Sequence, residues 1–275
     1  MNNPGLKRAA KACLNDARPD PKKVLFIYLI VLLGLDVGYS LISTLLERGM
    51  ETTAGGFGAL RFLKGYNSWF VVAPLVVQLV AMLWNAGYNF WALKTARGEE
   101  AGTDALYEGF HLFTKVVWLT VLEAVFIFLW SLLFIIPGII AAYRYRLAIY
   151  VLLDDQDLTA SEAINVSKRL TSGHKLELFI LDLSFWWYYL LIALASSFTL
   201  AENFSTLLGE YEAGVFPHLT TWQTFLAYLG SELVVMVVYW FFLPYVQTTY
   251  AHAYLYLRQL GDSRYMGNQA PDTDW

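Results

Sequence analysis

W-S-L-L-F-I-I-P-G-I-I-A-A-Y-R-Y-R-L-A-I-Y-V-L-L-D-D at 130–155 and G-H-K-L-E-L-F-I-L-D-L-S-F at 173–185 are the two stretches that decide the fold. The first is an apolar run that is interrupted at Pro137-Gly138, resumes, and ends in acidic residues. A short polar segment follows, and a second apolar run begins at Leu176. This pattern is typical of a chain that crosses a bilayer, exposes a segment to water and enters the bilayer again.

The composition extends this interpretation to the whole chain. Of its 275 residues, 57% are hydrophobic and 15% are charged, and the mean hydropathy is +0.45. Soluble domains average about 45–50% apolar and about 25% charged residues, so these charges are too few to cover a water-facing surface. The net charge of -4 gives no argument for a nucleic-acid partner. The single cysteine, Cys13, excludes an intrachain disulfide and a multi-cysteine metal site.

The apolar runs predict an all-α, polytopic membrane helix bundle. A single transmembrane domain at 24–258 is expected between a basic tail at 1–23 and a polar tail at 259–275. The first run exceeds the apolar core of a signal peptide, so we expect it to be retained as a span. One choice stays open, because 116–153 is either a hairpin of two spans or one long kinked helix. The six expected spans are 24–46, 68–93, 116–136, 139–153, 176–200 and 221–243.

The distribution of basic residues predicts the orientation of these spans. With six spans and both termini inside, the inner segments hold 14 lysines and arginines and the outer segments hold 3. Cytoplasmic segments carry the excess of such residues, so we predict an N-in, C-in protein of the bacterial cytoplasmic membrane. The alternative with one kinked helix divides the charges almost evenly.

A short amphipathic helix is expected in the cytoplasm between spans four and five. Thr159-x-x-Glu162 is a capping box that begins this helix, and Gly173 is suited to end it. Lys168, Arg169 and Lys175 lie near its apolar side. Two interpretations of 159–175 have equal weight: it binds anionic lipid headgroups or a cytoplasmic protein, or it packs under the bundle.

Polar residues at membrane depth form the candidate site. Each charge at the bilayer centre costs about 2.5–3.5 kcal/mol, so we expect the charges to pair. Arg144 or Arg146 is predicted to pair with Glu123 or Glu232. The amides of span two are spaced by seven and four residues and therefore share one helical face. The candidate residues are Asp36, Gln78, Asn85, Asn89, Glu123, Arg144, Arg146, Asp182 and Glu232.

Asp36 lies inside Gly34-x-x-x-Gly38, a spacing that lets another backbone approach closely. The whole polar set has two interpretations. Either the arginines neutralise the carboxylates and hold the helices in register, or the charges line a path for a solute or an ion. We favour the first interpretation, because nothing else in the sequence specifies a ligand.

Several motifs of the chain occur together: L-W-S-L-L-F-I-I-P-G-I-I-A-A-Y-R-Y at 129–145, Asp154, A-x-x-x-S-K-R-L-x-x-G-H-K at 163–175 and L-F-x-L-D-L-S-F at 178–185. Together they resemble a bacterial membrane family of unknown function, the domain-of-unknown-function family nine-seven-five. E-G-F at 108–110 and L-P-Y at 243–245 extend the resemblance over about 105–258.

The resemblance implies a multi-span membrane protein without a known activity. Milder forms of the pattern occur in the membrane domain of some glycerophosphodiester phosphodiesterases, but no soluble phosphodiesterase domain accompanies it here. This chain departs from the family in Arg144 and Arg146, where small polar residues are more usual, and in its longer outer loop at 201–220.

The sequence contains no motif for enzyme chemistry. Its four histidines lack metal-ligand spacing, and it has neither a phosphate-binding loop nor a G-x-S-x-G nucleophile elbow. We therefore expect no catalytic residues, no metal and no cofactor, and predict a non-enzymatic accessory or scaffold protein. The alternative is a transporter of a small solute, ion or lipid. A discontinuous helix at membrane depth would favour the alternative, and the sequence allows one at Pro137-Gly138 or Pro244.

Overall fold

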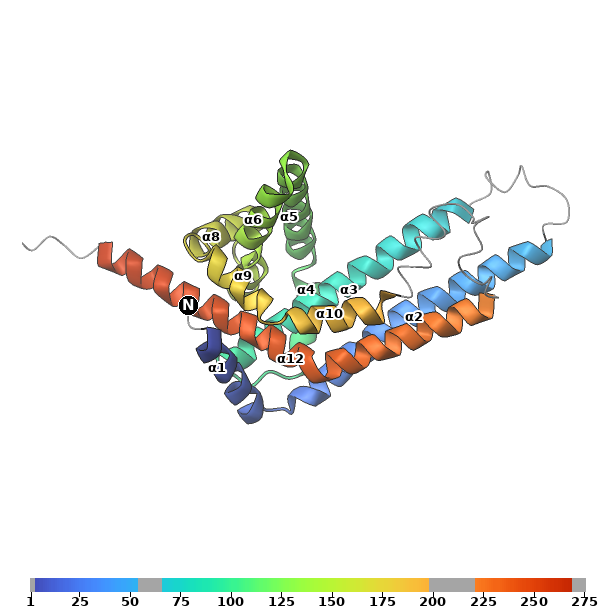
Figure 1. The fold of residues 1–275 in the computed structure, drawn as a ribbon, viewed down its shortest axis with the longest axis horizontal. Coiled ribbons are helices and arrows are strands. Elements are labelled where there is room, and N and C mark those ends of the chain that lie inside the picture. The colour runs from blue at the N-terminus through green and yellow to red at the C-terminus, as the bar shows by residue number, and fades with distance from the viewer. Residues whose placement is uncertain (1–2, 54–65, 198–220, 269–275) are drawn as a thin grey trace, which may run out of the picture. The chain divides into compact units, whose positions relative to one another are not determined.

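The computed structural model describes residues 3–53, 66–197 and 221–268, and within these ranges the chain forms helices and no strand (Figure 1). The all-α architecture is therefore confirmed. The helices are α1 (Asn3–Asp16), α2 (Pro21–Thr53), α3 (Tyr66–Ala96), the 3-10 helix η2 (Thr103–Tyr107), α4 (Glu108–His111), α5 (Phe113–Leu133), α6 (Ile135–Tyr145), α7 (Ala148–Asp154), α8 (Ala160–Leu170), α9 (Lys175–Leu183), α10 (Trp186–Ala195) and α12 (Thr221–Asn268).

Four of the described helices are long and apolar enough to cross a membrane. A fifth is added if α9 and α10, which are bent against each other at a short break, form one span. The sequence predicted six spans. The four candidate segments are Pro21–Ser43, Phe113–Leu133, Ile135–Asp154 and Tyr228–Asp262.

The expected ends of the last span require correction. Span six was expected to end at 243, before Pro244, but α12 continues through this proline to Asn268. Much of the segment predicted as a polar tail at 259–275 is therefore helical. The predicted outer loop at 201–220 lies outside the described residues.

The contacts between residues divide the chain into two compact units. Unit 1 comprises Met1–Val24, Leu83–Trp186 and Leu243–Trp275, and unit 2 comprises Leu25–Met82 and Trp187–Phe242. The helices α2, α3 and α12 contribute residues to both units. The single domain expected at 24–258 stays a prediction, and the two units are described separately.

The two runs on either side of Pro137 form a hairpin rather than one kinked helix. Between α5 and α6, Phe134 has an extended backbone with φ -161° and ψ 155°, which reverses the chain so that the two helices pack side by side (Figure 1). A Cβ atom on Gly138 would lie 2.1 Å from Ser131 Oγ, so the helices can approach this closely only at a glycine. The reversal occurs before Pro137, which lies in the first turn of α6, where its missing N–H leaves no intrahelical bond unmade.

The core of unit 1 is built on the end of α3. Tyr88 and Trp91 stack with ring centroids 5.1 Å apart, and Trp91 Nε1 donates to the Ala101 carbonyl at 3.1 Å. A Cβ atom on Gly87 would lie 1.9 Å from the carbonyl oxygen of Leu106, so η2 packs directly on the α3 backbone. The side chains that are almost completely buried in this unit include Tyr88, Trp91, Leu93, Leu106, Leu119, Leu147, Leu152, Leu153, Ile164 and Phe185.

The short amphipathic helix predicted after span four is α8. Thr159 and Glu162 form the expected capping box, in which the Thr159 side chain accepts from the Glu162 N–H and the Glu162 side chain accepts from the Thr159 N–H. Gly173 has φ +83°, as expected for the glycine that follows a helix. The hydroxyls of Ser167 and Thr171 donate to the Arg144 carbonyl at 3.0 and 3.2 Å and so join α8 to α6.

Most of the residues predicted as an N-terminal tail form α1, which packs on the region of α9. Asn3 Nδ2 donates to the Glu177 carbonyl at 3.4 Å, and Lys7 Nζ donates to the Ser184 carbonyl at 3.3 Å. The Lys7 ammonium also lies 4.0 Å from the ring centroid of Phe185. Burial lowers the pKa of Lys7. The basic residues of this segment are therefore partly used for packing within unit 1.

Unit 2 is held mainly by aromatic contacts between its helices. Phe26 and Trp240 meet edge to face at 6.2 Å, and Trp187 and Phe242 do so at 4.6 Å. Many of its outward side chains are large and apolar, which is typical of a surface that faces lipid. Examples with more than half of the residue exposed are Phe26, Val72, Leu75, Val76, Leu226, Val234, Val237 and Phe241.

Candidate functional site

The most highly charged contact of unit 1 is built around Asp154, the last residue of α7. Five of the six preceding residues of this helix are buried, and this burial fixes the position of the Asp154 carboxylate. The Asp154 side chain is only 3% exposed. A carboxylate at this depth needs hydrogen bonds or countercharges, because burial without them is strongly unfavourable.

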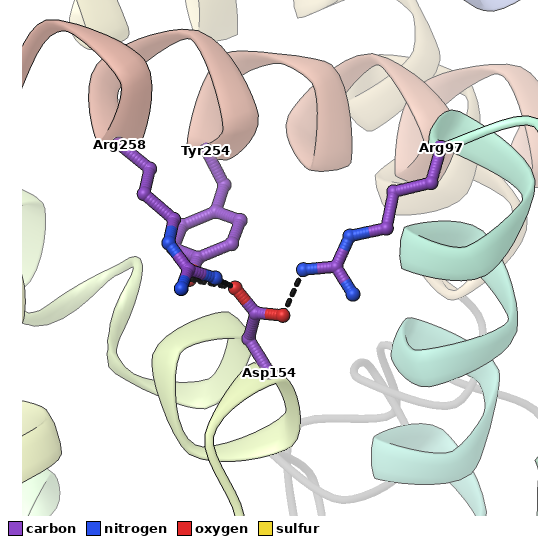
Figure 2. Close-up of polar contacts among 4 residues, drawn as sticks. All are labelled: Arg97, Asp154, Tyr254 and Arg258. Atoms are coloured by element: carbon purple, nitrogen blue, oxygen red, sulfur yellow. Dashed lines mark hydrogen bonds and ion pairs between the residues drawn. The ribbon is translucent and has the colours of Figure 1, made fainter. Parts of the chain in front are cut away.

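Three side chains from two other helices supply these partners (Figure 2). Arg97, the first residue after α3, binds Oδ1 of Asp154. Tyr254 and Arg258 approach from α12, where the Tyr254 hydroxyl donates to Oδ2 at 2.6 Å and Arg258 binds the same oxygen. The two arginines outnumber the one carboxylate, so this cluster carries a net positive charge. Their side chains remain 29% and 43% exposed.

A second carboxylate, Asp182 of α9, has partners of the same types. Tyr250 of α12 donates to its Oδ1 at 2.5 Å, and Tyr143 of α6 donates to its Oδ2 at 2.8 Å. Arg146 Nη1 lies 3.0 Å from Oδ2, and its guanidinium lies 4.5 Å from the ring centroid of Tyr250. The Asp182 side chain is 14% exposed.

Further polar side chains lie beside the Asp154 cluster. The rings of Tyr150 and Tyr254 stack at 5.9 Å, and the Tyr150 hydroxyl donates to Gln247 Oε1 at 3.2 Å. The same hydroxyl is 3.5 Å from Asn89 Oδ1. We call the two carboxylates, their partners and the side chains around Tyr150 the polar tract. It consists of Asn89, Arg97, Tyr143, Arg146, Tyr150, Asp154, Asp182, Gln247, Tyr250, Tyr254 and Arg258.

The structure brings some of the predicted site residues into this tract and separates others from it. Asn89 and Asn85 share a face of α3, as the spacing predicted, with Asn89 Nδ2 donating to Asn85 Oδ1 at 3.4 Å. Arg146 and Asp182 belong to the tract. Asp36, Gln78 and Glu232 lie in unit 2, so the nine predicted residues do not form one cluster within a single unit.

The predicted ion pairs require correction. Arg146 pairs with Asp182 and not with Glu123. Glu232 lies in unit 2, so its pairing with Arg146 stays a prediction. Tyr143 and Tyr250 donate to the same Asp182 carboxylate. Within the described part of the chain, neither Glu123 nor the Arg144 guanidinium makes an ion pair.

The close backbone approach predicted at Gly34 and Gly38 is also not observed. A Cβ atom on either glycine would have no described heavy atom of another segment within 4 Å. The Gly34-x-x-x-Gly38 spacing therefore forms no tight helix contact in the part of the chain that the structure describes.

Sequence reasoning missed Arg97, Tyr254 and Arg258. Each lies outside the predicted spans, so a search for charges at membrane depth passes over it. Asp154 was noticed only as an acid at the end of an apolar run and as part of a family motif. One signal was present: tyrosines at 250 and 254 and an arginine at 258 recur every four residues on one face of a helix.

The tract shows no arrangement typical of metal chemistry. Nowhere in residues 3–53, 66–197 and 221–268 do three or more His, Cys, Asp or Glu side chains gather at metal-binding distance. The carboxylates are instead surrounded by arginine and tyrosine donors.

The fold and the tract define an all-helical protein with several apolar helices that are suited to a membrane. Residues 131–261 match a family described as "Protein of unknown function (DUF975)", which confirms the resemblance seen in the sequence. The match includes both carboxylates and Tyr250 and Tyr254 of α12, while Arg97 lies outside it. No curated protein and no solved structure matches this chain. The likeness to the membrane domain of glycerophosphodiester phosphodiesterases stays a prediction.

Proposed function

We propose that this protein is a non-enzymatic accessory or scaffold protein of the cytoplasmic membrane, in which the polar tract holds helices together. The observation that supports this proposal is the coordination of Asp154 and Asp182. Both oxygens of each carboxylate are bound by arginine or tyrosine side chains from other helices. Carboxylates whose oxygens are already occupied in this way are poorly suited to bind a substrate.

The tract also connects segments that are far apart in the sequence. Its residues come from α3 and the residue after it, and from α6, α7, α9 and α12. The Asp154 cluster joins α7 to α12 and to the end of α3, and the Asp182 cluster joins α9 to α6 and α12. In a bundle with few charges, such clusters specify which helices pack together. This is the role expected of a structural core.

The alternative function, transport of a small solute, ion or lipid, is favoured by one observation. The chain breaks between α9 and α10 at Ser184 and Phe185, and Asp182 lies just before this break. Discontinuous helices beside charged residues are typical of transporter binding sites. The break is not at Pro137-Gly138 or Pro244, where the sequence allowed one.

Paired apolar replacement distinguishes the two functions. A strain that lacks the protein would be complemented with the double variant Arg146→Met/Asp182→Leu, and the level of folded protein would be measured in the same cells. A structural core predicts that the double variant folds and complements. Folding with loss of complementation would contradict the scaffold proposal and support a path.

Asp36→Asn is the second probe, because Asp36 lies outside the tract in unit 2. Purified wild-type and variant proteins in liposomes would be tested for proton, sodium and potassium flux with dyes for pH and membrane potential. The scaffold proposal predicts no flux above that of protein-free liposomes for either protein. A flux in the wild type that disappears in a stable Asp36→Asn variant would overturn the proposal.

A further inference from the structure

The closed end of the α5–α6 hairpin is the most exposed apolar feature of the described residues. It contains five consecutive large apolar residues with 63–78% of each residue exposed: Leu132, Leu133, Phe134, Ile135 and Ile136. From 124 to 142 the only polar side chain is that of Ser131. A turn that emerges from a membrane into water normally carries polar residues, so this turn is unsuited to an aqueous surface.

The other end of the hairpin is marked by α8, which packs against α5, α6 and α7. Lys168 of α8 holds its ammonium 5.6 Å from the ring centroid of Phe126 and 5.7 Å from that of Tyr145. These contacts place a cation beside α5 at the height of Phe126. In Figure 1 the closed end of the hairpin projects past α8.

The outward face of α8 is polar and faces away from the hairpin. Its exposed residues are Ser161, Glu162, Asn165 and Arg169, whereas Ala160, Ala163, Ile164 and Ser167 are buried. A helix with charged residues on its open face is expected in water or among headgroups and not in hydrocarbon. The headgroup layer therefore lies near the height of Phe126.

The remaining length of the hairpin is too short to cross a bilayer. From Phe126 to Leu133 α5 rises seven residues, or about 11 Å at 1.5 Å per residue. The hydrocarbon layer is about 30 Å thick, and each leaflet supplies about half of it. If the hairpin crossed completely, α8 would lie deep in the hydrocarbon and the apolar turn would lie in the opposite headgroups.

We propose that the α5–α6 hairpin is a membrane-inserting wedge that enters one leaflet from the cytoplasmic side and does not cross the bilayer. Its partner is the acyl-chain layer of that leaflet. The distribution of basic residues supports entry from the cytoplasmic side. In this topology all of 94–175 lies on the cytoplasmic side, so Arg144 and Arg146 add to the excess of lysines and arginines there. Insertion of the hairpin into one leaflet does not depend on the proposed function.

Labelling of single cysteines from each face of the membrane tests the proposal. The full-length protein would carry Cys13→Ser and either Ile135→Cys at the turn or Asn165→Cys on α8. An impermeant maleimide would be applied to intact cells and to inside-out vesicles. Asn165→Cys should react only in inside-out vesicles, and Ile135→Cys should react in neither preparation but react fully after denaturation. Reaction of Ile135→Cys in intact cells would overturn the proposal.

Depth measurement distinguishes a turn inside the leaflet from one that is merely inaccessible. A bimane fluorophore on Ile135→Cys, with Leu132→Cys as a second position, would be quenched in vesicles by lipids that carry a nitroxide on the headgroup or on the acyl chain. We expect the acyl-chain nitroxide to quench at least twofold more strongly at both positions. Stronger quenching by the headgroup nitroxide would contradict insertion.

Discussion

Tyr250 and Tyr254 lie one turn apart on α12 and donate their hydroxyl protons to two different aspartates. Tyr250 donates to Asp182 at 2.5 Å, and Tyr254 donates to Asp154 at 2.6 Å. Residues four apart in a helix share one face, so a single face of α12 binds the end of α7 and the end of α9.

Removal of the Tyr254 hydroxyl should destabilise the protein. Tyr254→Phe keeps the ring that stacks on Tyr150 but removes a hydrogen bond to a charged group, for which about 1.5–3 kcal/mol is typical. Tyr256→Phe is the matched control, because no contact of the Tyr256 hydroxyl is seen in the described residues. Thermal unfolding in detergent should show a lower Tm for Tyr254→Phe only, and equal Tm values for the two variants would contradict the account.

Neutralisation of Asp154 should be more damaging than neutralisation of a nearby exposed acid. Asp154→Asn leaves Arg97 and Arg258 close together without a countercharge between them. Because both arginines are partly exposed, solvent screening reduces the effect, and we expect a loss of about 1–3 kcal/mol. Asp157→Asn is the control. The difference between the variants should shrink in high salt, and its absence in low salt would refute the role of Asp154.

Two glycines should respond to alanine with opposite signs. Gly87→Ala forces a Cβ atom against the Leu106 backbone, so we expect a loss of about 1–3 kcal/mol. Gly230 lies in α12 and has open space around its Cβ position, so Gly230→Ala should be neutral or stabilising by up to about 1 kcal/mol. Chemical denaturation of both variants measures these changes. A destabilised Gly230→Ala with an unaffected Gly87→Ala would contradict the packing described here.

The capping box of α8 should make stability depend on pH in the acid range. The hydrogen bond from the Thr159 N–H, followed by that from the Thr159 hydroxyl, lowers the pKa of Glu162. Because the pKa of Glu162 is lower in the folded state, ionised Glu162 stabilises α8 at any pH above the pKa of the unfolded chain, which is about 4.3. This stabilisation is lost as the pH falls through the lower pKa of the folded state. Glu162→Gln keeps a capping oxygen but does not titrate. Between pH 6 and pH 3.5 the Tm of the wild type should fall further than the Tm of Glu162→Gln. Equal decreases would contradict a role for ionised Glu162 in the capping box.

Much of the fold could be predicted from local signals. Low charge and long apolar runs indicate membrane helices, and the Thr159–Glu162 spacing with Gly173 marks α8 almost to the residue. The sequence did not distinguish the hairpin from a kinked helix, because proline is the usual signal for a break in a helix. The reversal occurs instead at Phe134, an apolar residue that carries no such signal. Its conformation depends on the close packing of Gly138 against Ser131, which is a tertiary contact.

The candidate site was less predictable than the fold. A search for charges within apolar runs found Arg146 and Asp182 but assigned Arg146 the wrong partner, since the choice of carboxylate depends on how α9 packs beside α6. Asp154 and Arg97 lie at helix ends, where charges are common and usually solvated, and Arg258 lies in α12 beyond the predicted span. Only the three-dimensional arrangement distinguishes a buried carboxylate from an exposed one at such a position.

The central claim is that the tract stabilises the fold through specific pairs, and a double-mutant cycle on Arg146 and Asp182 tests it most directly. Folding free energies in detergent would be measured for Arg146→Met, Asp182→Leu and the double variant, beside a parallel cycle with Arg144→Met. The account predicts a coupling of about 1 kcal/mol or more for Arg146, and additivity within about 0.5 kcal/mol for Arg144. Additive effects for Arg146 and Asp182, or equal coupling in both cycles, would contradict it.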